Sequence, residues 1–226
     1  MTSLAKRALT GLIQFLLVLG LLLLLPAWSL HYWEAWLYWA VFSGCTLAIT
    51  IQLLRRDPAL VARRLHAGPG AEQEKTQKII QALASVLVVV LFVVPGLDRR
   101  FGWSPSIGAA WEIVADVLVA VGFLVMFLAF RENTHAASII AVEADQRVVS
   151  SGVYALVRHP LYTGGVLTFL ATPIALGSVF ALIPAVALSV VIGVRLLAEE
   201  RFLLEHLAGY RAYCQTVRFR LVPGLW

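Results

Sequence analysis

The sequence predicts an all-α fold, a polytopic helix bundle embedded in a membrane with five or six transmembrane helices. Of the 226 residues, 60% are hydrophobic and only 14% are charged, and the mean hydropathy is +0.84. These values lie far outside the range of ordinary soluble domains. A span needs about 20 mostly apolar residues in a helix, because hydrocarbon offers no hydrogen-bond partners to the backbone.

Six apolar stretches meet or approach this length. They cover residues 9–30, 33–54, 79–97, 109–130, 162–176 and 179–197. The fifth stretch is short and contains Pro173, and only Gly177 and Ser178 separate it from the sixth. This spacing predicts a tight helical hairpin. Five full spans with one partly inserted segment are the alternative to six spans.

The distribution of Lys and Arg predicts that both ends of the chain are cytoplasmic, since positively charged loops stay in the cytoplasm. With the N-terminus inside, only Arg99 and Arg100 fall on the outer side. The membrane topology of the chain and attraction to anionic lipid therefore explain the net charge of +5. The sequence contains no basic, aromatic-rich module typical of nucleic-acid binding, so we expect no nucleic-acid partner. At the outer end of the fourth span, Glu112 and Asp116 are expected to face water.

The two cysteines predict neither a metal site nor a disulfide framework. Cys45 lies within a span and Cys214 in the tail, and no CxxC or Cys/His spacing surrounds them. We therefore expect no metal.

The chain divides into two regions of different composition. Residues 1–130 form a transmembrane region with four apolar helices, and residues 131–226 contain most of the side chains capable of chemistry. Apolar and polar residues alternate at 138–142 and 147–149, which indicates a short hairpin or an irregular segment. The basic, aromatic tail after the last span is typical of an amphipathic cap at a membrane surface.

The first candidate site segment is RHPLYTGG, residues 158–165. Pro160 suits a first helical turn, so the amides near His159 should point out of a helix N-terminus, where anions are favoured. Gly164 and Gly165 allow a ligand or a helix to approach closely. Membrane-edge positioning and helix packing could also explain these residues one by one.

The second candidate segment lies where the last span leaves the bilayer. Arg195 and Glu199 are four residues apart on one helical face. Charges at this depth are costly unless they are paired or line a cavity, so both are candidates for function. Glu200 also suits an interfacial ion pair. Asn133 and His135 follow the fourth span on the same side and are expected to line the substrate pocket.

The ordered combination of these segments resembles the isoprenylcysteine carboxyl methyltransferase family. That family belongs to a superfamily that also contains phospholipid N-methyltransferases. The similarity covers residues 130–226 and consists of RHPLYTGG, then Arg195-x3-Glu199-Glu200-x2-Leu203, then Gly209-Tyr210-x2-Tyr213.

The resemblance implies an integral membrane methyltransferase that uses S-adenosylmethionine in a pocket at the cytoplasmic face. It implies that Arg195 and Glu199 lie next to the methyl acceptor and are the catalytic residues. It assigns these residues to the cofactor pocket: Tyr154, Arg158, His159, Pro160, Tyr162, Glu199 and Glu200.

The chemistry of this cofactor suits the residues. Glu199 can neutralise its ammonium group, Arg158 can hold its carboxylate, and Tyr162 can face its sulfonium. A carboxylate acceptor is already ionised and needs no base, so Arg195 would orient it. An amine acceptor would have to lose a proton, to Glu199 or His159. A lipidic acceptor, such as an isoprenylcysteine carboxylate, could enter sideways from the bilayer.

Three alternatives remain at this point. The acceptor could be a phospholipid amine or another small amine. Membrane sterol reductases carry an RHPxY-like stretch and use NADPH, but they usually have Asn where this chain has Leu161. The protein could also be a non-enzymatic membrane protein, a transporter or an assembly factor. A transporter would be expected to show broken helices or repeated halves with polar groups near mid-bilayer, whereas the polar groups here gather at one surface.

Overall fold

A computed structural model of the protein describes residues 3–65, 70, 74–135 and 146–226. These ranges contain helices and no β-strand, so the all-α prediction is confirmed. The helices are α1 (Ser3–Ala27), α2 (Trp33–Arg56), α3 (Pro58–Arg64), α4 (Lys75–Phe101), α5 (Ala109–Glu132), α6 (Pro160–Ala175), α7 (Leu182–His206), α8 (Tyr210–Thr216) and the 3-10 helix η1 (Gly152–Ala155).

Five of these helices are long and apolar enough to cross a membrane: α1, α2, α4, α5 and α7. Large apolar side chains cover their outer surfaces, including Leu17 at 60%, Val86 at 59% and Ile183 at 70% exposure. Water would not tolerate so much contiguous apolar surface, whereas lipid chains cover it. The protein is therefore an integral membrane protein. With 16 residues, α6 is shorter than a span, which fits the alternative with five full spans.

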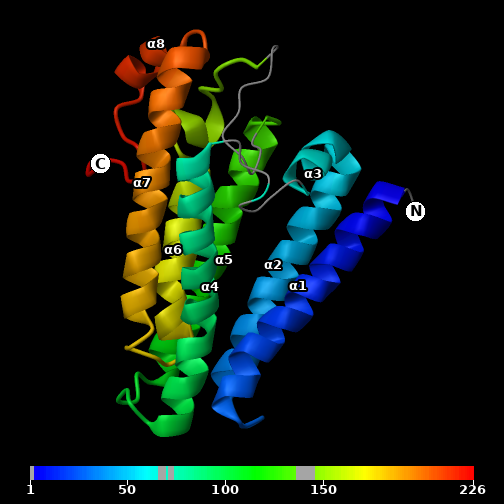
Figure 1. The fold of residues 1–226 in the computed structure, drawn as a ribbon, viewed down its shortest axis with the longest axis vertical. Helices are drawn as coiled ribbons and strands as arrows, with labels where there is room; N and C mark the ends of the chain where they lie inside the picture. The colour runs from blue at the N-terminus through cyan, green and yellow to red at the C-terminus, as the bar shows by residue number, and fades with distance from the viewer. Residues whose placement is uncertain (1–2, 66–69, 71–73, 136–145) are drawn as a thin grey trace.

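The long helices run roughly along the same axis. The pair α1–α2 diverges from α4–α7, and the two groups are furthest apart at the end of the bundle that carries α3 and α8 (Figure 1). Both ends of the chain lie toward that end of the bundle (Figure 1). The short helix α3 begins at Pro58, with the Asp57 side chain accepting a hydrogen bond from the Leu60 amide at 2.9 Å. Its apolar residues Leu60 and Val61 pack against Phe130 of α5.

The closest helix pair is α5 and α6, which cross at Gly122 and Gly164. A Cβ atom on Gly164 would lie 2.5 Å from the carbonyl oxygen of Gly122, so only glycine permits this separation. Small residues allow such close backbone contact between membrane helices. The crossing fixes α6 against α5 and thereby places the start of α6, where the RHPLYTGG segment lies.

At the opposite end of the bundle, Glu112 and Asp116 are only 5% and 4% exposed. The expectation that they face water was wrong. The turn between α6 and α7 lies against Glu112: a Cβ atom on Gly177 would lie 3.4 Å from Glu112 Oε1. The same turn is tied to α4 because the Ser178 hydroxyl donates to Asp98 at 2.5 Å. From sequence, the position of this turn against Glu112 was not visible.

The connection between α5 and η1 is only partly described. Residues 146–150 form no regular structure, so the irregular alternative holds for 147–149. The other alternating stretch, 138–142, lies outside the described residues.

Candidate active site

A cavity of about 480 Å³ lies at the α8 end of the bundle, between α4, α5, α6 and α7. Most of the residues predicted for the site line it: Asn133, His135, Tyr154, Arg158, His159, Tyr162, Arg195 and Glu199. Pro160 and Glu200 were also predicted for the cofactor pocket, but they are not among its lining residues. The structure therefore brings together residues from segments that are far apart in the sequence.

The start of α6 is bonded to the C-terminal tail. The amides of Arg158 and His159 donate to the carbonyl oxygens of Phe219 and Arg220 at 2.9 and 3.0 Å. The Thr163 hydroxyl donates to the carbonyl oxygen of Leu221 at 2.8 Å. The His159 amide is thus not open to an anionic ligand, contrary to the expectation for that residue. The tail satisfies the two amides that precede the first residue of α6.

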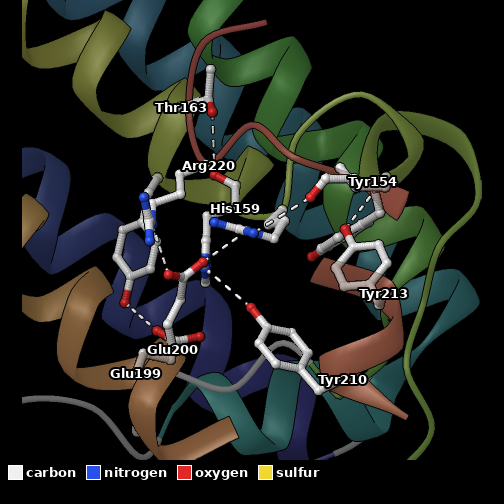
Figure 2. A network of polar contacts seen from close by, with 11 residues as sticks. Tyr154, His159, Thr163, Glu199, Glu200, Tyr210, Tyr213 and Arg220 are labelled. Atoms are coloured by element: carbon white, nitrogen blue, oxygen red, sulfur yellow. Dashed lines mark hydrogen bonds and ion pairs between the residues drawn. The ribbon is translucent and has the colours of Figure 1, made fainter. Parts of the chain in front are cut away.

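Glu200 is the centre of an ion-pair network (Figure 2). Its Oε1 lies 2.8 Å from Arg158 Nε and 3.3 Å from His159 Nε2, and Arg220 Nε donates to its Oε2 at 2.7 Å. The glutamate is 6% exposed. A buried carboxylate with three such partners is well satisfied. Glu200 therefore joins α7 to the start of α6 and to the tail, and it orients residues that line the cavity.

Glu199 points to a different partner. The Tyr162 hydroxyl donates to Glu199 Oε2 at 2.5 Å, which links α6 to α7 inside the cavity. One turn earlier on α7, Arg195 donates to Gln77 Oε1 of α4 at 3.4 Å. Arg195 and Glu199 line the same cavity, as their spacing predicts.

Tyr154 and Asn133 form the wall between α5 and η1. The side-chain amide of Asn133 donates to the Tyr154 hydroxyl at 3.4 Å, and the backbone amide of His135 donates to Asn133 Oδ1 at 3.0 Å. Burial raises the pKa of Tyr154 to about 12, so it is a neutral phenol at physiological pH. This wall presents neutral polar groups.

Two tyrosines of α8 complete the cavity. The Tyr213 hydroxyl donates to the Tyr154 carbonyl oxygen at 2.7 Å, and the Tyr210 hydroxyl lies 3.4 Å from His159 Nε2 (Figure 2). Burial raises the pKa of both phenols well above the ordinary value. The tail therefore roofs the site, as an amphipathic cap could.

The cavity changes character with depth. Its mouth contains the polar groups at the helix ends and on α8. Its deep part lies at least one helical turn further into the bundle and is lined by Gln81, Met126, Gly165, Phe169 and Ile192. Tyr162, Glu199 and Arg195 lie between the two parts. The cavity can therefore hold a polar molecule at its mouth and an apolar group below it.

Sequence reasoning did not identify several lining residues. Arg64 comes from α3 and Gln81 from α4, both within residues 1–130, which were taken as apolar scaffold. The Asp57-Pro58 pair is a helix-start signal that could have predicted α3. Tyr210 and Tyr213 carried part of the family resemblance but were not proposed as site residues. Arg220 does not line the cavity, and its bond to Glu200 gave no sequence signal because Arg220 lies in the irregular tail and Glu200 on α7.

Metal binding has no support in the described part of the chain, where no group of three or more His, Cys, Asp or Glu side chains could hold a metal ion. The polar groups of the site are instead arranged as hydrogen-bonding and ion-pairing partners.

These features define a helical integral membrane protein with a part-polar, part-apolar cavity at one end of its bundle. Residues 111–209 match the model of the phospholipid methyltransferase family. The match confirms the predicted resemblance at this level, since that family includes the isoprenylcysteine carboxyl methyltransferases. It supports a membrane methyltransferase. A separate comparison with curated proteins finds no match.

The matched range runs from the start of α5 to Gly209. It contains every site residue predicted from the sequence. Arg64, Gln81, Tyr210 and Tyr213 line the cavity from outside this range. The parts of the chain beyond the match therefore contribute to the same cavity.

Proposed function

We propose that the protein uses S-adenosylmethionine to methylate the carboxylate of a lipidic acceptor similar to isoprenylcysteine, at the cytoplasmic face of the membrane. One observation carries the proposal. Tyr162, Glu199 and Arg195 lie between the polar mouth and the mostly apolar deep part of a single cavity. A water-soluble cofactor and a lipidic acceptor need these two environments side by side.

The cavity as a whole has the size of a small-molecule site, and its mouth suits the charges of the cofactor. Small-molecule sites enclose about 300–1,000 Å³, and this cavity measures about 480 Å³. Glu199 would neutralise the ammonium group of the cofactor, and Arg158 retains N–H donors for its carboxylate beyond those engaged with Glu200 and the tail. When bound, S-adenosylmethionine supplies an activated methyl group.

The residues around the acceptor would act by alignment. A carboxylate is ionised at neutral pH, so its oxygen can attack without a base. Arg195 would hold this carboxylate by charge-assisted hydrogen bonds. The apolar residues of the deep part would exclude water from the reacting groups. The excess of arginine over carboxylate among the lining residues supports an anionic acceptor.

The first test is calorimetric titration of the detergent-purified protein with S-adenosylhomocysteine, with NADPH run in parallel. We expect saturable binding of S-adenosylhomocysteine alone. Binding of NADPH alone would assign the protein to the reductases, and binding of neither compound would support a non-enzymatic protein.

A phospholipid amine is the second candidate acceptor, because the matched family model is described as phospholipid methyltransferase. An amine must be neutral when it attacks, and Glu199 or His159 could take its proton. The structure places His159 Nε2 between Glu200 and Tyr210, so Glu199 is the better placed base.

Radiolabelled methyl transfer distinguishes the two acceptors. The protein would be supplied with S-farnesylcysteine or phosphatidylethanolamine, and the product would then be treated with alkali. A methyl ester releases labelled methanol under alkali, whereas an N-methyl group is stable. We expect alkali-labile label on S-farnesylcysteine; stable label on phosphatidylethanolamine alone would reject carboxyl methylation.

A further inference from the structure

Two adjacent glycines of α6 have opposite surroundings. A Cβ atom on Gly164 would lie 2.5 Å from the Gly122 carbonyl oxygen and 2.6 Å from Met126 Cγ, so α5 fills its space. A Cβ atom on Gly165 would meet only Phe169 Cε2, at 4.0 Å, which is ordinary contact. Close helix packing therefore explains Gly164 but does not explain Gly165.

The backbone does not require glycine at position 165 either. Gly165 is in the middle of a regular helix and is not among the glycines with positive φ. Glycine inside a helix is less favourable than alanine by about 1 kcal/mol. The feature that remains is its place on the cavity wall, where the missing side chain leaves space.

This space lies directly below the proposed methyl-transfer position. Tyr162, Gly165 and Phe169 share one face of α6, and Ile192 lies one turn below Arg195 on α7. At a rise of about 1.5 Å per residue, Gly165 is about 5 Å and Phe169 about 10 Å deeper than Tyr162. An acceptor held at Arg195 would extend its apolar group past Gly165 toward Phe169 and Ile192.

We propose that Gly165 determines the size of the apolar group that the acceptor can carry next to its methylated group, an inference that rests on the proposed function. A side chain at this position narrows the deep part of the cavity. The larger the side chain at position 165, the smaller the apolar group that still fits, while the cofactor site at the mouth stays intact. Gly165 is thus a specificity-determining residue rather than a packing residue.

The test combines three variants with acceptors of graded size. Gly165→Ala, Gly165→Val and Gly165→Leu would be titrated with S-prenyl, S-geranyl and S-farnesylcysteine, and kcat/KM would be measured with S-adenosylmethionine. We expect Gly165→Leu to lower binding and kcat/KM for the farnesyl compound at least about tenfold, as steric exclusion typically does. The prenyl compound should change less than about twofold, and alanine and valine should give intermediate effects.

Gly193→Leu on α7 is the matched control, because a Cβ atom there meets nothing within 4 Å and the residue does not line the cavity. It should leave all acceptors unchanged. S-adenosylhomocysteine binding is measured for every variant and reports on the proposed function separately. An equal loss for all acceptors, no loss in Gly165→Leu, or no binding of any apolar compound to the wild type would overturn the inference.

Discussion

At the scale of single residues, two adjacent glutamates of α7 have different tasks. Successive residues of a helix point about 100° apart, because a turn contains about 3.6 residues. Glu199 therefore faces the cavity and receives the Tyr162 hydroxyl, whereas Glu200 faces Arg158 and Arg220. The first is placed for a ligand, and the second holds the site together. Substitutions at the two positions should therefore change different properties: ligand affinity for Glu199 and stability for Glu200.

Glu199→Gln should weaken S-adenosylhomocysteine binding by about tenfold to a hundredfold, because a charged hydrogen bond contributes about 1.5–3 kcal/mol. The amide can still accept the Tyr162 hydroxyl, so the fold should be retained. Calorimetric titration measures the affinity, and thermal unfolding checks the fold. Glu205→Gln, an exposed change on the same helix, is the control. Unchanged affinity in a folded Glu199→Gln protein would remove this residue from the cofactor pocket.

Glu200→Gln should instead lower stability, by about 3–5 kcal/mol, because it leaves Arg158 and Arg220 without their carboxylate. The tail should then detach from α6 more readily. Thermal unfolding in detergent measures the first effect, and the rate of tryptic cleavage at Arg218 and Arg220 measures the second. A variant with the stability and cleavage rate of the wild type would contradict the central role of Glu200.

At the scale of helices, the site depends on the crossing of α5 and α6. Gly122 and Gly164 allow the two backbones to touch, and this contact sets where the RHPLYTGG segment begins. The pattern of small residues indicated this packing, but it could not distinguish Gly164 from Gly165. Only the partner helix decides which glycine is crowded.

Gly164→Ala should destabilise the protein by about 1–3 kcal/mol, the usual effect of an added methyl group in a tightly packed interior. Gly193→Ala should be neutral or slightly stabilising, since its Cβ meets nothing and alanine favours helix. Thermal unfolding of the two variants side by side gives the comparison. Equal stabilities would show that α5 and α6 do not depend on this close contact.

The sequence predicted the long helices well, because twenty apolar residues in a row leave the chain few alternatives in lipid. It also placed Arg195 and Glu199 on a common helical face, and both line the cavity. It could not predict that the tail would occupy the amides of Arg158 and His159, because those partners are separated by about sixty residues and leave no local pattern. The position of the turn between α6 and α7 against Glu112 was hidden for the same reason.

At the scale of the whole molecule, all the proposed chemistry lies at one end of an apolar bundle. The end that carries α3 and α8 contains the cavity, and the distribution of arginine predicts that this end is cytoplasmic. The opposite end contains the loop between α4 and α5. Orientation in the membrane can therefore be tested with two exposed positions.

Ser106→Cys and Arg218→Cys would be introduced singly after replacing Cys45 and Cys214 with serine. Both positions are exposed; one lies between α4 and α5 and the other directly after α8. The α4–α5 connection and α8 are at opposite ends of the bundle (Figure 1). In intact cells, a membrane-impermeant maleimide should label Ser106→Cys and should label Arg218→Cys only after lysis. The reverse pattern would place the cavity on the outer side and would separate it from the cytoplasmic pool of cofactor.

Because the tail is hydrogen-bonded to the start of α6, the site is complete only after the tail has been synthesised. A membrane protein is inserted from its N-terminus while the ribosome is still translating, and early segments fold before late ones. Helices α1 to α5 are therefore made well before residues 219–221, which bond to the start of α6. A nascent chain that lacks these residues would hold an unfinished site.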